Sequence, residues 1–391
     1  MMHRLVCVSL MLCAHAWAQA PAAPEDGPAP PALVAELFET VVKLPVTVQP
    51  LYGGPHQGEM VLTHFKPPGD GPFPAVVMQH GRDGTQRATP ARYRYTDVAR
   101  YWTRRGVAVF VPTRVGYGDS GMAVDPEFTG DCDKKNYDVA AAATNVQTLA
   151  AIDFATKQPW VLPNKVLVMG QSMGGFATVV AMGAKHPSVI AGINFAGGGG
   201  GDPVNRKANP CGYHRLANTF EKAGKANGGS TPMLWLYAEN DLFWGADIPR
   251  KWHEAYTSAG GKAEFAAFGP VSTDGHSLLS KGLPLWRPVL DQFVAKLGIA
   301  PPKAAGAPPA SGYAAIDDAS KLPKVKQDVK DSGYLRFLTT DLPRAMAIGP
   351  KGEWAFFSGD NVIQRSLERC AQTAKTACKL YAVDDSVVWT D

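Results

Sequence analysis

The chain has 391 residues, of which 45% are hydrophobic and 19% charged, and its formal net charge at pH 7 is +4. This composition is ordinary for a globular protein and leaves room for one large domain plus a smaller one. The mild charge, without a basic run or basic residues interleaved with aromatics, argues against a nucleic-acid partner.

The N-terminus has the pattern of a secretory signal peptide over residues 1–20. It begins with the positive residues His3 and Arg4, continues through an apolar core at 5–14, and ends near a small-residue cleavage site at 16–18. The apolar core is too short for a permanent membrane span, and no other segment of the sequence reaches that length. We therefore expect an exported mature protein, periplasmic or extracellular, without a membrane span.

Composition divides the rest of the chain into four parts. Residues 21–43 are a Pro/Ala-rich lead-in, and residues 44–298 alternate strand-like with helix-like segments. Residues 299–312 are a Pro/Ala/Gly linker. Residues 313–391 are expected to form a small α+β accessory module.

Apolar stretches predict the strands of the large domain. Residues 60–65 alternate as an edge strand would, and the stretches typical of buried strands are 75–79, 107–111, 166–169, 189–195, 233–237 and 263–268. Helical patterns fall at 93–105, 139–157, 173–184, 215–225, 249–259 and 285–297. Short buried strands separated by helices are typical of a mostly parallel sheet covered on both faces, which is an α/β fold. In the C-terminal module, we expect an amphipathic helix at 362–374 and a strand at 378–383.

The strand at 166–169 runs directly into Gly170-Gln171-Ser172-Met173-Gly174. A Gly-x-Ser-x-Gly turn between a buried strand and a helix is the pattern of a nucleophile elbow. The two glycines leave room, because a Cβ at either position would collide with neighbouring backbone. The serine stands at a helix N-terminus, where free N–H groups favour developing negative charge. Ser172 is therefore the predicted nucleophile.

A serine nucleophile needs a base and an acid, and elbow-type hydrolases carry them in the order Ser, acid, His. Asp241 follows the strand at 233–237 and is the predicted acid, with Glu239 and Asp247 as alternatives. His276 stands in the loop after the last predicted strand and is the predicted base. In these roles the acid orients the imidazole, and the imidazole accepts the serine proton.

About two-thirds of the chain, residues 45–298, resembles the dienelactone hydrolase-like branch of the α/β-hydrolase superfamily. The resemblance rests on His80-Gly81, Arg114–Gly121 and Gly170–Gly174, together with Asp241 and His276. Dienelactone hydrolases proper use a cysteine nucleophile, whereas position 172 is serine. This departure favours the esterases and peptidases that share the scaffold.

A tetrahedral intermediate also needs two hydrogen-bond donors for its oxyanion. The residue after the nucleophile, Met173, supplies one backbone N–H. The resemblance implies that the second comes from Arg82, with Gly81 as the alternative. We expect His80 to pack beneath this loop and the turn at 114–121 to brace it.

Two further segments are predicted near the site. The glycine run at 197–201 follows the strand after the elbow, and either leaves an open cleft or is a floppy turn. Phe243 and Trp244 stand two and three residues after the predicted acid, and either wall the substrate pocket or are core aromatics.

Four cysteines remain after the signal peptide: Cys132, Cys211, Cys370 and Cys378. An even number in an oxidising compartment favours disulfides. Cys370 and Cys378 are close in sequence and are paired first, which leaves Cys132 with Cys211; buried free thiols are the alternative. No Cys/His cluster indicates a metal, and no cofactor is expected.

The sequence thus predicts a secreted serine hydrolase that cleaves carboxylic esters, small or polymeric, through an acyl-enzyme. One alternative is a serine peptidase of the prolyl-oligopeptidase type. Such peptidases usually carry a large N-terminal propeller, and only about twenty residues separate the signal peptide from the predicted hydrolase domain. The other alternative is a non-catalytic binding protein of the cell envelope. The oligomeric state is left open.

Overall fold

The computed structural model describes residues 32–390. The predicted signal peptide, 1–20, and most of the predicted lead-in, 21–43, lie outside the described residues. Within the described part of the chain, no helix is both long enough and apolar enough to cross a membrane.

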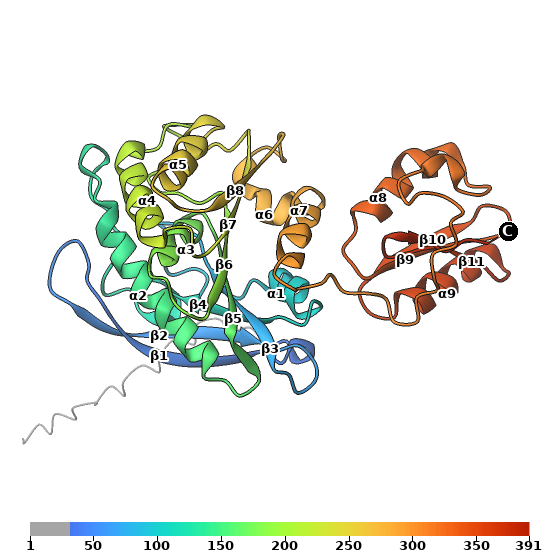
Figure 1. Cartoon of the computed structure of the whole chain (residues 1–391), viewed down its shortest axis with the longest axis horizontal. Helices are drawn as coiled ribbons and strands as arrows, with labels where there is room; N and C mark the ends of the chain where they lie inside the picture. Colours follow the sequence, from blue (N-terminus) through green and yellow to red (C-terminus); the bar gives the residue numbers. More distant parts are fainter. Residues whose placement is uncertain (1–31, 391) are drawn as a thin grey trace, which may run out of the picture. The chain divides into compact units, whose positions relative to one another are not determined.

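The larger part of the described chain is built on an eight-stranded sheet, ordered β1-β2-β4-β3-β5-β6-β7-β8 (Figure 1). The strands are β1 Thr40–Val48, β2 His56–Phe65, β3 Phe73–Gln79, β4 Ala108–Thr113, β5 Val161–Gln171, β6 Val189–Phe195, β7 Met233–Ala238 and β8 Ala263–Phe268. The β1/β2 and β2/β4 pairs are antiparallel. All pairings from β4 across to β8 are parallel, so the predicted mostly parallel sheet is confirmed.

Helices cover both faces of this sheet, as predicted. They are α1 Thr96–Thr103, α2 Tyr137–Thr156, α3 Met173–Gly183, α4 Tyr213–Asn227, α5 Asp247–Ser258, α6 Leu278–Lys281 and α7 Leu283–Ala295. Figure 1 shows α2 to α5 on one side and α1, α6 and α7 on the other. Successive residues of a strand point to opposite faces of the sheet, and each face has its own hydrophobic core. Val77 belongs to the core that contains Phe176 of α3, and Val76 belongs to the core that contains Trp102 of α1.

The N-terminal edge of the sheet differs from the prediction. Residues 60–65 are not an edge strand, because β1 lies outside β2 and takes the edge. β1 starts at Thr40, within the segment predicted as lead-in. Every residue from Met60 to Phe65 is buried, including Thr63, whose hydroxyl accepts a hydrogen bond from Arg92 at 3.0 Å. The alternating pattern here therefore belongs to a strand that is covered on both faces, with Thr63 hydrogen-bonded inside and the His64 ring packed against Phe110 and Trp160.

The C-terminal residues form a separate antiparallel sheet, ordered β10-β9-β11-β12. Its elements are α8 Tyr334–Thr339, β9 Arg344–Ile348, β10 Trp354–Ser358, α9 Val362–Ala374, β11 Lys379–Val383 and β12 Ser386–Val387. The helix predicted at 362–374 and the strand predicted at 378–383 are present as α9 and β11. A core containing Tyr334, Met346 and Tyr381 lies within this part, and a disulfide joins Cys370 of α9 to Cys378.

Short turns of other helix types complete the described structure. They are 3-10 turns at Ala35–Leu37 (η1), Gly118–Ser120 (η2), Cys132–Lys134 (η3), Gly275–Ser277 (η4) and Ala319–Lys321 (η5), and a π turn at Val329–Gly333 (η6).

Candidate active site

Ser172 stands between the end of β5 and the start of α3, with φ 57° and ψ −122°. A positive φ is uncommon for a residue other than glycine and marks a strained turn. The flanking glycines make the turn possible. A Cβ on Gly170 would lie 2.1 Å from the Gly174 carbonyl oxygen, and one on Gly174 would lie 2.1 Å from that of Gln79. The segment therefore has the strand–turn–helix geometry predicted for a nucleophile elbow.

The structure brings Asp241 and His276 together at the carboxyl ends of β7 and β8. Nδ1 of His276 lies 3.0 Å from Oδ2 of Asp241, whose side chain is fully buried. A carboxylate can only accept, so we assign the hydrogen to Nδ1, which leaves Nε2 as an acceptor. The alternative acids, Glu239 and Asp247, are exposed, and neither pairs with His276 in the described structure.

The second oxygen of Asp241 is also occupied. Its Oδ1 accepts the backbone N–H of Phe243 at 2.8 Å and of Trp244 at 3.1 Å. The Phe243 ring stacks on the His276 imidazole with 4.0 Å between centroids, and Trp244 meets it edge-on at 5.4 Å. The acid and the two aromatic residues after it therefore fix the position of the imidazole.

Two residues to which sequence reasoning gave no role tie the loops together. Oδ1 of Asp274 accepts the backbone N–H of His276 at 2.9 Å and of Leu242 at 3.0 Å. Gln171, next to Ser172, donates from Nε2 to the His276 carbonyl oxygen at 3.0 Å. An Asp two residues before the His was a usable signal, since Asp commonly accepts from a backbone N–H two residues on. The Gln171 contact depends on the tertiary fold.

The two predicted oxyanion donors lie on segments that meet at the elbow. The Met173 N–H opens α3 and has no partner within that helix. The Arg82 N–H makes no hydrogen bond to any residue from 32 to 390. The loop of Arg82 passes close to the elbow, since a Cβ on Gly81 would contact that of Ser172 at 3.4 Å.

The Arg82 side chain is tied to two residues of a neighbouring segment, which holds its loop in place. It donates to both oxygens of Asp125, at 2.7 and 2.6 Å, and to the Tyr117 hydroxyl at 3.0 Å. A paired guanidinium–carboxylate contact of this kind fixes geometry as well as adding energy.

His80 is fully buried and supports this loop. Its Nδ1 lies 2.6 Å from the Gly81 carbonyl oxygen, its Nε2 accepts from the Arg114 N–H at 3.0 Å, and its ring stacks on Tyr93. Burial, reinforced by the Arg114 cation, holds the pKa of His80 well below its ordinary value. His80 is thus a neutral packing residue, as predicted. Arg114 is itself buried against Glu127, which leaves it no access to substrate.

A cavity of about 290 Å³ opens beside Ser172. Its walls include Met173, Phe243 and Trp244, and the glycine segment 198–201. Trp244 is 2% exposed and donates from its indole to the Ala196 carbonyl oxygen at 2.8 Å, so it is a core residue that also borders the cavity.

The glycine run is a tightly packed wall of this cavity. A Cβ on Gly200 would lie 2.3 Å from the Tyr137 hydroxyl, and one on Gly201 would lie 2.7 Å from the Phe243 ring. The sequence left two possibilities for this run, an open cleft or a floppy turn, and these close contacts are incompatible with a floppy turn.

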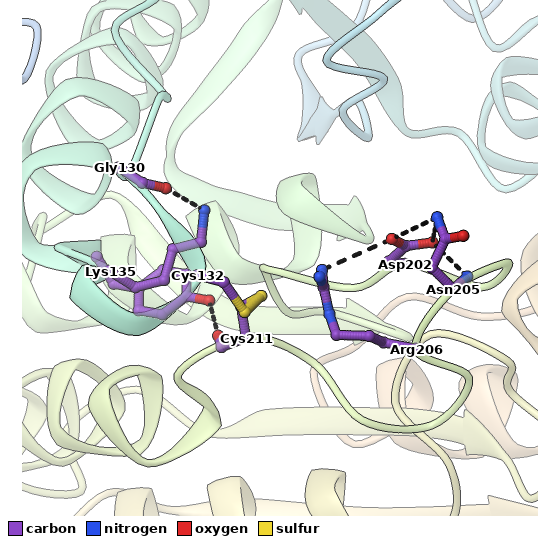
Figure 2. Close-up of a disulfide and its surroundings, with 8 residues drawn as sticks. Gly130, Cys132, Lys135, Asp202, Asn205, Arg206 and Cys211 are labelled. Carbon is purple, nitrogen blue, oxygen red and sulfur yellow. Dashed lines mark hydrogen bonds and ion pairs between the residues drawn. A yellow bond between two sulfur atoms is a disulfide. The ribbon is translucent and has the colours of Figure 1, made fainter.

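A disulfide between Cys132 and Cys211 lies at the same cavity, and Cys211 contributes to its lining. Figure 2 shows this bond with the basic side chains of Lys135 and Arg206 around it. The part of the chain that the structure describes contains no group of His, Cys, Asp or Glu residues arranged to hold a metal ion.

A mostly parallel sheet covered on both faces, with a strand–turn–helix elbow at the edge where Asp241 and His276 meet, defines the α/β-hydrolase fold. The chain belongs to the dienelactone hydrolase family, whose model matches residues 61–281, more than half of its length. The resemblance seen in the sequence is thereby confirmed.

Solved structures of the same superfamily are similar to this chain at low identity. One described as a dienelactone hydrolase from Klebsiella pneumoniae subsp. pneumoniae MGH 78578 is 16% identical, with a TM-score of 0.41 over 66% of this chain and 98% of that one. A puromycin-hydrolysing peptidase of Mycobacterium tuberculosis is 17% identical, with a TM-score of 0.42 over 66% and 40%. An acylaminoacyl peptidase of Pyrococcus horikoshii is 14% identical, with a TM-score of 0.41 over 67% and 42%. The chain therefore spans about two fifths of each peptidase. No curated protein sequence matches it.

Proposed function

We propose that this protein is an exported serine hydrolase that cleaves carboxylic esters through an acyl-enzyme. The observation that carries the proposal is the 3.0 Å contact between His276 Nδ1 and Asp241 Oδ2, beside a serine in a strained elbow. A buried carboxylate that orients an imidazole is the arrangement that activates a serine hydroxyl.

In the proposed reaction, His276 accepts the Ser172 proton at Nε2 while the Ser172 oxygen attacks the ester carbonyl carbon. Asp241 stabilises the imidazolium that forms. The imidazolium then protonates the leaving alcohol, and water activated by His276 releases the acid. Ser172 and His276 share no hydrogen bond in the described structure, and such contacts often tighten only in the substrate complex.

The oxyanion of the tetrahedral intermediate would be held by the N–H groups of Met173 and Arg82. Donors that point at a developing charge before the reaction starts need no reorganisation, and losing one costs about 3–4 kcal/mol in other hydrolases. The buried neutral His80 and the Arg82–Asp125 pair supply the rigidity that such a site needs.

The size of the cavity favours an ester with a small acyl group over an extended peptide. At about 290 Å³ it lies at the lower end for ligand pockets. The glycine wall of this cavity is tightly packed, because added methyl groups at Gly200 and Gly201 would overlap neighbouring side chains. A peptidase remains the second candidate, which the following assay separates from the first.

The test is labelling of the mature protein with a fluorophosphonate probe, with Ser172→Ala as the control. We expect wild type to label and the variant not to label. Absence of labelling in folded wild type would overturn the enzyme proposal and favour a binding protein. Release of nitrophenol from short-chain acyl esters, without cleavage of peptide anilides, identifies an esterase; the opposite result identifies a peptidase.

Export is proposed on separate grounds. The structure contains two disulfides, Cys132–Cys211 and Cys370–Cys378, and disulfides persist mainly in oxidising compartments. The N-terminal sequence of the protein recovered from cells tests this. We expect it to begin after the small-residue site at 16–20, and an intact Met1 would contradict export through this segment.

A further inference from the structure

Two aromatic side chains from distant parts of the sequence lie next to each other at the cavity beside Ser172. Phe128 belongs to the segment between β4 and α2 and lines the cavity. Tyr52 lies in the turn between β1 and β2. Its ring centroid is 6.1 Å from that of Phe128, and the ring planes are tilted by 45°. Neither residue belongs to the triad or to the proposed oxyanion donors.

Both rings are open to solvent. Tyr52 is 72% exposed and Phe128 is 37% exposed. Within residues 32–390, neither ring belongs to the hydrophobic cores on the two faces of the large sheet. A single exposed aromatic side chain needs no explanation. Two that contact each other beside a catalytic cavity form an apolar surface that a ligand can bury favourably.

Phe128 is held firmly by its two neighbours in the chain. Glu127 is buried and forms an ion pair with the buried Arg114. Thr129 is also buried, and its carbonyl oxygen accepts the backbone N–H of Asn136 at 2.7 Å. The backbone is therefore fixed on both sides of Phe128, while its ring is presented to solvent. A ligand that binds to this ring has little chain to order.

The turn that carries Tyr52 is fixed as well. The side-chain amide of Gln49 donates to two carbonyl oxygens of this turn, each at 3.0 Å. The side chain of Leu51 reaches the segment that carries Phe128, since a Cβ on Gly130 would lie 3.4 Å from it. The two aromatic residues are therefore held side by side by contacts that do not involve their rings.

The cavity wall differs in character from one part to another. Its glycine part is tightly packed at Gly200 and Gly201, whereas its Phe128 part is open to solvent. In the proposed reaction, the alcohol departs first while the acyl group stays bound to Ser172. The alcohol must therefore have a path to solvent, which the open part of the wall provides.

We propose that Tyr52 and Phe128 form an aromatic ledge that binds the alcohol part of the ester, so that the substrate class is esters whose alcohol carries an aryl ring. This inference rests on the proposed esterase function. Aromatic rings attract one another beyond the effect of the area they bury. The ledge should therefore favour an aryl ring over an aliphatic chain of the same length.

The experiment compares 2-phenylethyl acetate with hexyl acetate. Both are acetates of primary alcohols of similar length, so the bond that breaks and the basicity of the leaving group are matched. We expect wild type to hydrolyse the phenylethyl ester with the higher kcat/KM, and Tyr52→Ala or Phe128→Ala to lower the ratio of the two values roughly fivefold each. Equal kcat/KM for the two esters in wild type would overturn the inference.

Matched variants separate the aromatic rings from apolar surface in general. Phe128→Leu should lower the ratio like Phe128→Ala, whereas Phe128→Tyr should keep it, because only the second change retains a ring. Val41→Ala and Leu285→Ala remove exposed apolar side chains outside the cavity wall and should keep the wild-type ratio. The ratio does not depend on the concentration of active enzyme, so partial unfolding of a variant cannot imitate the effect. A Phe128→Leu variant with the wild-type ratio would contradict the aromatic ledge.

Binding separates this inference from the proposed function. Saturation-transfer NMR of folded Ser172→Ala with 2-phenylethanol should show binding that is lost when Phe128→Ala is added. Binding of this alcohol without fluorophosphonate labelling of wild type would leave the ledge in place and overturn the hydrolase. Labelling and ester cleavage, with equal kcat/KM for the two acetates and no binding of 2-phenylethanol, would leave the hydrolase in place and overturn the ledge.

Discussion

Asp241 holds His276 with one carboxylate oxygen and its own loop with the other. Oδ2 lies 3.0 Å from the imidazole Nδ1, and Oδ1 accepts the backbone N–H groups of Phe243 and Trp244. The carboxylate therefore cannot turn without breaking three hydrogen bonds. This saturation fixes which imidazole nitrogen bears the hydrogen, and so leaves the other nitrogen available toward the elbow.

The first prediction concerns Asp241→Asn. In this variant the side-chain amide oxygen can still accept the backbone N–H groups of Phe243 and Trp244. The amide NH₂ group then faces His276. That group donates to Nδ1 and forces the hydrogen onto Nε2, so the base is lost while the fold is kept. We expect kcat on a nitrophenyl ester to fall by about 10⁴.

The controls for this prediction are Glu239→Gln and Asp247→Asn. Both are exposed carboxylates near Asp241 in the sequence, Glu239 just after β7 and Asp247 at the start of α5, and neither pairs with His276 in the described structure. They should keep near-wild-type kcat. If Glu239→Gln instead reproduces the loss, Asp241 is not the acid.

The second prediction concerns the loop that carries the Arg82 N–H. Asp125→Asn removes one half of the paired contact at 2.7 and 2.6 Å and leaves the Arg82 side chain held mainly by its hydrogen bond to the Tyr117 hydroxyl. We expect kcat to fall about tenfold with little change in KM, because the donor acts mainly on the tetrahedral intermediate.

Steady-state kinetics of Asp125→Asn beside Asp119→Asn measure this effect. Asp119 is exposed and lies outside the cavity wall, so its variant should match wild type. A rise in KM at constant kcat would show that Asp125 affects substrate binding and not the oxyanion site.

The sequence was sufficient to predict those helices and strands whose residue pattern is local. The helix at 362–374 coincides with α9, because its apolar residues repeat at helical spacing within one segment. β1 and the β9–β10 hairpin were missed. Only two residues of β1 are buried, Val46 and Val48 at its C-terminal end. They belong to a core shared with α2, which is remote in sequence. Burial that depends on a distant partner leaves little local signal.

The same distinction applies to the site. Ser172, Asp241 and His276 could be named because the elbow and the chain order are features of the sequence itself, and the structure brings Asp241 and His276 into contact. Gln171 could not, since its contact with the His276 loop forms only in the folded chain.

The third prediction compares the two disulfides. In the chain-entropy model, Cys132–Cys211, with a sequence separation of 79, stabilises by about 4–5 kcal/mol, and Cys370–Cys378, with a separation of 8, by about 2–3 kcal/mol. Replacing both cysteines of a pair by serine should therefore cost more for the first pair. Urea unfolding of each double variant, with reduced wild type as reference, measures this. Equal stability of wild type with and without reductant would contradict both disulfides.

The fourth prediction follows from the buried imidazole of His80. Its pKa in the folded protein lies well below 6.5, the ordinary value that applies when the chain unfolds. Above pH 6.5 the imidazole is neutral in both states and adds no pH dependence. Below pH 6.5, the His80 imidazole binds a proton in the unfolded chain but stays neutral in the folded protein. The free energy of unfolding therefore falls as the pH falls. The largest slope from one such group is about 1.4 kcal/mol per pH unit.

The free energy of unfolding should therefore decline between pH 7 and pH 5 less steeply in His80→Gln than in wild type. His214→Gln, an exposed histidine, is the control and should keep the wild-type slope. The comparison uses slopes because His64 and His253, whose pKa values burial also lowers, contribute in the same direction in all three proteins. Parallel slopes for wild type and His80→Gln would contradict a neutral His80. If His80→Gln does not fold, NMR titration of wild type decides, since the His80 imidazole signals should stay at their neutral positions down to pH 5.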